Sequence, residues 1–149
     1  MTAIPGQGAS PPLFLTFRAG GERFGVPLGR VRGAHRPRRI APLPGAPAVY
    51  AGVVLVKGEA LGVVCARRAL LPGREAVAAT GGATCLPVIL LFAGDSRALL
   101  VDRVDGIEAV DDSTVSPPHW TSRHVSGVVE GTGRRLSLVD VDALLGSQP

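Results

Sequence analysis

The chain has 149 residues, 46% of them hydrophobic but only 4% aromatic, and a formal net charge of +4. This length allows a single domain or two very small subdomains with a buried core built from Val, Leu and Ala, and no apolar run approaches the roughly 18 residues that a membrane-spanning helix needs. Because the N-terminus lacks the basic and apolar regions of a secretory signal, and two cysteines are too few for a disulfide framework, we expect a cytoplasmic protein.

The first elements in chain order are a tail and a hairpin. Residues 1–12 are small, polar and proline-rich, which predicts a flexible tail. From 13 to 28, apolar and polar residues alternate on both sides of Gly20-Gly21, as in a β-hairpin. The basic and proline-rich stretch 30–45 is expected to cross the surface as a connection, and 46–50 to form a single helical turn.

A second pair of strands follows in the first half. Apolar runs predict strands at 51–56 and 60–66, joined by a turn at Lys57-Gly58-Glu59. A brief helix is expected over 68–71. The stretch 74–84 is the best internal boundary, because most of its residues are small and it shows no periodic apolar pattern.

The second half repeats this order of elements. Predicted strands lie at 87–92, 97–101, 107–110, 124–130 and 134–139. A short helix over 140–145 closes the chain, with Asp140 as its N-cap and Gly146 as its stop.

Two residue patterns that each occur twice in the sequence indicate an internal duplication. Gly52-Val53-Val54, followed by Gly58, Leu61 and Val64, recurs 75 residues later as Gly127-Val128-Val129, followed by Gly133, Leu136 and Val139. Residues 17–33 similarly align with 90–106, shifted by 73. Such half-units cannot bury both faces alone, so we expect halves of about 13–73 and 85–146, side by side or intertwined, within one domain over 13–146.

The sequence contains no motif typical of a catalytic or metal-binding site. No Cys or His pair has ligand spacing, no Ser lies in a nucleophile elbow, and no glycine motif of a dinucleotide site follows a strand. The acidic residues lie mostly in pairs at strand ends, where turn and cap roles explain them. We therefore expect no enzyme activity, no metal and no cofactor.

The excess positive charge is concentrated in one stretch. It comprises Arg30, Arg32, Arg36, Arg38 and Arg39. This run fits a solvated loop or a contact with an acidic protein surface. A nucleic-acid-binding small barrel is a further alternative, although few aromatic residues lie near enough to stack on bases.

One long motif resembles a known family. The run Ile40-Ala41-Pro42-Leu43-Pro44-Gly45-Ala46-Pro47-Ala48-Val49-Tyr50-Ala51-Gly52-Val53-Val54-Leu55-Val56-Lys57-Gly58 is similar to the signature of the CheW-like domain, the coupling module of bacterial chemosensory systems. The similarity continues in order through 101–107, 127–129 and 138–145, and covers about Phe14 to Leu145. The resemblance implies an all-β fold, in which two small SH3-like five-stranded β-barrels pack together with short helices, and it implies no catalysis.

The resemblance also implies two protein partners and a cytoplasmic location at receptor clusters. One subdomain would bind the regulatory domain of a CheA-type histidine kinase, and the cleft between subdomains would bind the cytoplasmic tip of a chemoreceptor, without nucleic acid or membrane insertion. The residues expected at these protein-binding surfaces are Val31, Arg32, Gly52, Lys57, Gly58, Val101, Asp102, Val104, Gly106 and Gly127. The three valines also fit a strand core, and Lys57 also fits a solvated hairpin tip.

Three departures from the family pattern fall in the first half. Lys57 stands where the family usually has Arg, Gly33 where a Glu is common, and Cys65 where Asp is common and the second half has Asp140. Lys replaces a planar bidentate cation with a point charge. An open alternative is therefore a divergent member that retains only one of the two partners.

Overall fold

The computed structural model describes residues 11–37, 39–71, 87–118, 124–131 and 134–146. The predicted N-terminal tail and internal boundary lie almost entirely outside these residues. The strands are β1 (Leu13–Ala19), β2 (Glu22–Pro27), β3 (Val31–His35), β4 (Tyr50–Val56), β5 (Glu59–Cys65), β6 (Val88–Phe92), β7 (Arg97–Val101), β8 (Arg103–Ala109), β9 (Val115–Ser116), β10 (Val125–Gly131) and β11 (Arg134–Val139). The helices are η1 (Leu28–Arg30), α1 (Ala66–Leu70), η2 (Asp112–Thr114) and α3 (Val141–Gly146).

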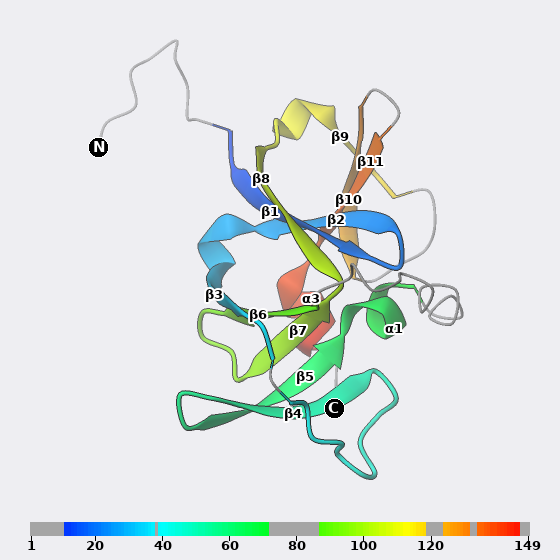
Figure 1. Cartoon of the computed structure of the whole chain (residues 1–149). Helices are drawn as coiled ribbons and strands as arrows, with labels where there is room; N and C mark the ends of the chain where they lie inside the picture. Colours follow the sequence, from blue (N-terminus) through cyan, green and yellow to red (C-terminus); the bar gives the residue numbers. More distant parts are fainter. Residues whose placement is uncertain (1–10, 38, 72–86, 119–123, 132–133, 147–149) are drawn as a thin grey trace.

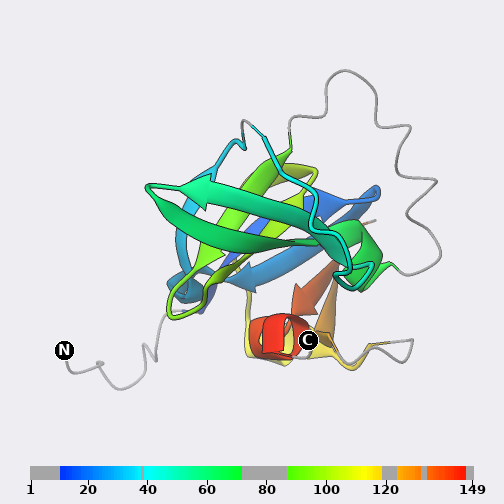
Figure 2. The same cartoon turned by 90° about the horizontal axis from the view of Figure 1, so that it is seen from below.

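These strands form two sheets, which confirms the predicted all-β class with short helices. Sheet A has the order β8-β1-β2-β11-β10-β9, and sheet B has the order β3-β6-β7-β5-β4. Sheet A lies above sheet B in Figure 1, with α3 between them. Figure 2 views the molecule from the side of sheet B.

Each sheet contains strands from both halves of the sequence. The first hairpin, β1–β2, joins sheet A, whereas β3, β4 and β5 of the same half form sheet B together with β6–β7 of the second half. The order β3-β6-β7-β5-β4 in sheet B matches β8-β1-β2-β11-β10 in sheet A, strand for strand along the sequence repeat. The two copies of the repeat thus exchange hairpins.

Strand registers confirm the duplication residue by residue. In the β4–β5 hairpin Gly52 lies opposite Val63, and in the β10–β11 hairpin Gly127 lies opposite Leu138, each after a one-residue register shift. The parallel pairs also agree, because Gly62 of β5 lies opposite Arg97 and its equivalent Ser137 of β11 lies opposite Phe24.

The expectation of a loop throughout 30–45 is wrong. Residues 31–35 form β3, an edge strand that pairs with β6 and places Val31 opposite Phe92. An edge strand needs a neighbour on only one side, so it tolerates the exposed Arg32. The strand ends before Pro37, which cannot donate a ladder hydrogen bond.

The helical turn expected over 46–50 is also absent. Tyr50 donates its backbone N–H to the Pro47 carbonyl at 3.0 Å, but the segment forms a turn and Tyr50 already begins β4. The brief helix expected at 68–71 lies at Ala66–Leu70, and the strand expected at 107–110 is the longer β8. Pairing with β1 extends β8 through polar residues that the apolar pattern does not mark.

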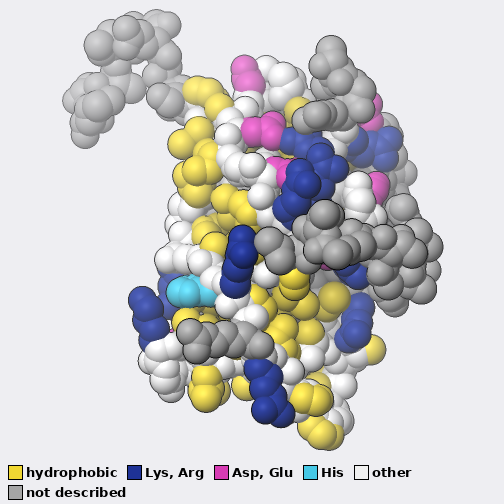
Figure 3. All heavy atoms as spheres, in the orientation of Figure 1, with side chains coloured by type: hydrophobic (Ala, Val, Ile, Leu, Met, Phe, Trp, Pro, Cys, Tyr) yellow, Lys and Arg dark blue, Asp and Glu magenta, His cyan; other side chains and the backbone are white. Residues whose placement is uncertain are grey.

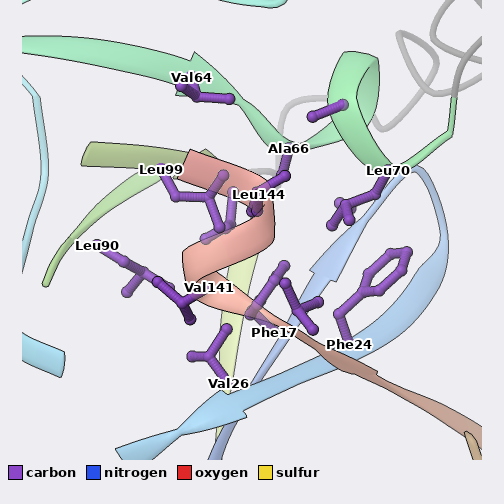
Figure 4. Close-up of a cluster of buried hydrophobic side chains, with 14 of the residues drawn as sticks. Phe17, Phe24, Val26, Val64, Ala66, Leu70, Leu90, Leu99, Val141 and Leu144 are labelled. Carbon is purple, nitrogen blue, oxygen red and sulfur yellow. The ribbon is translucent and has the colours of Figure 1, made fainter. Parts of the chain in front are cut away.

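A common core joins the two sheets. Its fully buried members include Phe17 and Phe24 from sheet A, Leu90 and Leu99 from sheet B, and Leu144 from α3. The two phenylalanine rings stack with their centroids 5.7 Å apart. Figure 4 shows these side chains converging around α3. The sheets therefore pack as one body, and separate smaller cores lie within sheet B and within sheet A.

The two equivalent helices differ in their N-caps, as the sequence predicts. Asp140 Oδ1 accepts a hydrogen bond from the backbone N–H of Ala143 at 3.1 Å, whereas Cys65 makes no side-chain capping bond to α1. The backbone is the same in both places, since Cys65 N–H donates to Val49 and Asp140 N–H donates to His124. Only the side chain distinguishes the two caps.

This difference predicts opposite effects of two substitutions. Cys65→Asp should raise the free energy of unfolding by about 0.5–1 kcal/mol, because the carboxylate can accept an otherwise unpaired N–H of α1, whereas Asp140→Ala should lower it by about 1 kcal/mol. Urea unfolding followed by circular dichroism measures both changes. Cys65→Ala, which adds no acceptor, is the matched control. If Asp140→Ala left the free energy of unfolding unchanged, the assignment of Asp140 as the cap would be wrong.

Candidate protein-interaction surface

The residues expected at protein-binding surfaces fall into two groups in the structure. Val31 and Arg32 on β3 lie on the same sheet as Gly52, Lys57 and Gly58 of the β4–β5 hairpin. The second group lies at the passage from sheet B to sheet A and comprises Val101, Asp102, Val104 and Gly106, with Gly127 on β10. The structure therefore does not bring the ten residues into one continuous site.

In the first group, an ion pair links β3 to the hairpin tip. The Nη2 atom of Arg32 lies 3.3 Å from Oε1 of Glu59, and both side chains are exposed. The cation of this pair lies on β3 and its carboxylate lies beside the hairpin tip, next to the cation Lys57. An exposed pair of this kind stabilises the fold by only about 0–1 kcal/mol. The pair therefore matters less for stability than for the charges, Arg32 and Glu59, that this surface presents to a partner.

Lys57 occupies a backbone conformation that side chains rarely adopt. Its φ is 51° and that of Gly58 is 81°, and the two residues form the turn between Val56 and Glu59. Positive φ at both central positions is typical of a type I′ turn, which favours Asn followed by Gly. The turn is therefore built around Gly58, and Lys57 points its charge into solvent at some cost in stability.

Lys57→Asn should therefore stabilise the hairpin. We expect the free energy of unfolding to rise by about 0.5–1 kcal/mol, because Asn tolerates the left-handed conformation better than Lys. Lys57→Ala removes the same charge without that tolerance and is the control. Equal stabilities of the two variants in urea would contradict the turn assignment.

The second group is mainly structural. Val101 is completely buried in the common core, so its side chain cannot contact a partner. Asp102 accepts hydrogen bonds from the Gly20 backbone N–H at 2.8 Å and from Arg67 Nε at 2.7 Å. Asp102 thereby ties the β1–β2 turn and α1 to the start of β8. This arrangement fixes the position of one sheet relative to the other.

Two equivalent glycines allow chain segments to approach the hairpins closely. A Cβ atom added to Gly52 would lie 2.1 Å from the Ala41 carbonyl oxygen, and one added to Gly127 would lie 2.4 Å from Val115 Cγ1. At Gly52 the approaching segment is held by two backbone hydrogen bonds of 2.8 Å between Ala41 and Val53. These glycines shape the surface without contributing side chains to it.

A groove runs between β4 and the segment that follows β3. It has a volume of about 620 Å³, and the buried side chains of Val54 and Ile89 line it. The basic residues that line it are His35, Arg36, Arg39 and Lys57. Figure 3 shows hydrophobic side chains between lysine and arginine side chains over sheet B, while acidic side chains gather over the upper half of the same face. The basic run is evident in the sequence, whereas the groove becomes evident only in the folded chain.

Asp111 and Asp140 perform the turn and cap roles that the sequence predicts for the acidic residues, whereas Asp105 and Asp142 instead form ion pairs with arginines. Asp95 accepts a hydrogen bond from the Arg97 backbone N–H at 2.9 Å, and Asp111 accepts one from that of Ser113 at 3.0 Å. The Ser113 bonds lower the pKa of the Asp111 carboxyl. Within the part of the chain that the structure describes, no three His, Cys, Asp or Glu residues group as a metal site would require.

None of the helices in the described ranges is both long enough and apolar enough to cross a membrane.

Comparison with known proteins gives a consistent result at the levels of family, sequence and structure. The model of the CheW-like domain matches residues 13–148. A chemotaxis protein CheW of Rhizobium meliloti is 30% identical over 141 residues, which cover 90% of this chain and 87% of the relative. A chemotaxis protein CheW of Treponema pallidum is 25% identical over 140 residues, covering 90% of this chain and 82% of the relative.

A solved structure shares the fold. The crystal structure of the scaffolding protein TtCheW from Thermoanaerobacter tengcongensis superposes with a TM-score of 0.76 at 16% identity, covering 94% of this chain and 91% of that one. The predicted architecture of two SH3-like barrel subdomains is thereby confirmed, with the short β9 as a sixth strand of sheet A.

Proposed function

The chain belongs to the CheW-like domain family and is a non-catalytic scaffold protein of chemotaxis, and from this we propose that it couples a chemoreceptor to a CheA-type histidine kinase. The observation that carries the proposal is the match of the family along residues 13–148, which includes both sheets and the core between them. We further propose that it acts in the cytoplasm, at membrane-associated receptor clusters.

The proposed mechanism is geometric. A protein that binds kinase and receptor at the same time raises their local concentration and fixes their relative orientation, so that the receptor's state biases the kinase. The core shared by Phe17, Leu90 and Leu144 supports this role, because it holds two surfaces, one on each sheet, in a fixed relation. We propose the expected residues on β3 and the β4–β5 hairpin as one contact surface.

A second candidate is a member that has kept only one of the two partners. The observation that favours it is the departure at two positions of this surface, Gly33 where the resemblance implies Glu and Lys57 where it implies Arg. A partner cation that pairs with a carboxylate at position 33 would find none here and would instead meet the exposed Arg32, which disfavours binding.

Calorimetric titration of the full chain tests both candidates. The kinase regulatory domain and the receptor's cytoplasmic fragment, encoded with this chain, are titrated separately, and coupling requires that both bind. Binding of only one supports the single-partner candidate, and binding of neither refutes both.

Exchanging the charges of Arg32 and Glu59 distinguishes an effect on partner binding from an effect on the stability of the fold. Arg32→Glu alone places two carboxylates together, whereas Arg32→Glu with Glu59→Arg restores an ion pair with the opposite polarity. If the pair contacts a partner, the double variant should unfold like the original chain in urea yet bind that partner more weakly. Unchanged affinity of both variants would remove β3 from the contact surface.

A further inference from the structure

The cations that have no described partner all line one groove. Seven described arginines form ion pairs, namely Arg18, Arg23, Arg30, Arg32, Arg67, Arg103 and Arg135. Arg68 donates to the carbonyls of Ala48 and Tyr50, and Arg97 to that of Leu145.

Arg36, Arg39 and Lys57 form neither an ion pair nor a hydrogen bond with any residue that the structure describes, and all three line the groove beside β4. No carboxylate is among the described residues that line this groove. Exposed like charges repel one another in the absence of a counter-charge. This groove therefore carries positive charges that no described carboxylate neutralises, whereas the other arginines whose side chains the structure describes have partners.

The duplication supplies an internal comparison for the groove. In sheet A, the segment after β8 buries Val110 against Leu136 and Leu138 before it pairs with β10. In sheet B, the equivalent segment runs from β3 to Ala41, which pairs with Val53 as Ser116 pairs with Val128 in sheet A. None of its described residues from 36 to 40 is fully buried. Ile40 packs against the core of sheet B but is only partly buried, so the described part of this segment holds no fully buried side chain in the role of Val110.

The backbone of β4 is also open along this groove. Val53 pairs with Ala41, but β4 forms no further bridge with the described part of the connecting segment. The next residue on that edge, Leu55, leaves 72% of its surface exposed. A strand edge that is paired at one position only can accept an extended segment from another chain.

We propose that this groove binds an extended acidic segment of a partner protein, which places an aliphatic side chain over Val54 and Ile89. The carboxylates of the segment pair with Arg36, Arg39 and Lys57. The aliphatic side chain occupies the space that corresponds to Val110 in sheet A. The described lining of the groove contains no Phe, Tyr or Trp on which nucleic-acid bases could stack. This inference goes beyond the coupling function and holds whichever partner supplies the segment.

Amide chemical shifts of the isotope-labelled full chain test the proposal with defined probes. The first probe is a short peptide that alternates glutamate with valine. The second replaces glutamate with lysine, the third replaces valine with serine, and the fourth is single-stranded oligothymidine. We expect shifts in 39–41 and 53–57 with the first peptide, weaker binding of the serine peptide, and no binding of the lysine peptide or the oligonucleotide.

Substitutions then identify the contacts. The triple variant Arg36→Gln, Arg39→Gln and Lys57→Gln should bind the first peptide at least about tenfold more weakly, and added salt should reduce the difference. Arg103→Gln on β8 is the matched control, because it removes an exposed charge far from the groove, and it should bind like the original chain. Urea unfolding verifies that both variants fold.

Three results would overturn the proposal. They are shifts of the first peptide confined to other surfaces, equal affinity of the triple variant, and oligonucleotide binding at the groove that is tighter than peptide binding. Because the probes need neither kinase nor receptor, these results would not contradict the coupling function. Failure of the coupling test would likewise not change the affinity of the groove for the peptide.

Discussion

Gly52→Ala is expected to lower the free energy of unfolding by about 3–5 kcal/mol, a large part of the 5–15 kcal/mol that stabilises a typical domain. The new Cβ would lie 2.1 Å from the Ala41 carbonyl oxygen, and the obstacle is backbone, which cannot rotate away. The φ of Gly52 is also 146°, a conformation that favours glycine. Relief would require breaking the two hydrogen bonds between Ala41 and Val53.

Gly29→Ala is the matched control for this substitution. A Cβ atom at Gly29 would meet nothing within 4 Å, and its φ is not positive. We expect a change within about 0.5 kcal/mol. Chemical unfolding of the two variants measures the contrast. If Gly52→Ala were as stable as Gly29→Ala, the close approach of residues 40–41 to β4 would be wrong, and with it the wall of the groove.

Leu144→Ala should be nearly as costly, with a loss of about 2–5 kcal/mol. Leu144 is completely buried in the core that the two sheets share, and the small helix α3 cannot collapse into the cavity without moving Asp140 and its cap. Leu55→Ala, at a position that is 72% exposed, is the control and should change stability by less than about 0.5 kcal/mol.

The same variant tests whether the two sheets unfold together. Because Leu144 packs among residues of both sheets, amide signals from each sheet and circular dichroism should report one transition, shifted to lower urea concentration. Two separate transitions in the original chain would show that the sheets are independent units. That result would remove the physical basis for a fixed geometry between two partner surfaces.

Much of this fold can be predicted from the sequence because the strands are hairpins with clear patterns. Gly20-Gly21 separates two alternating runs, and the shift of 75 residues between Gly52 and Gly127 matches the strand registers. Pattern and turn signals are local, so they locate hairpins well. The cap difference between Cys65 and Asp140 also follows from the same alignment.

The features that escaped prediction depend on contacts between distant segments. β3 pairs with β6 through a run that contains Arg32 and Gly33, and no local pattern marks such an edge strand. A repeat shows that two copies exist, but it does not determine which copy supplies each strand. The groove forms where the described residues of the segment after β3 include no fully buried side chain like Val110, and this difference can be recognised only by comparing the two folded connecting segments.

The most direct test of the central claim is whether this chain brings the kinase to the receptor. Membranes that contain the receptor are sedimented with a fixed amount of the kinase and increasing amounts of the purified chain, and the kinase in the pellet is measured. A coupling protein predicts that sedimented kinase rises with added chain and falls again at large excess, when separate copies occupy each partner. If the chain sediments with the membranes while the kinase stays in the supernatant at every concentration, the chain does not couple the two.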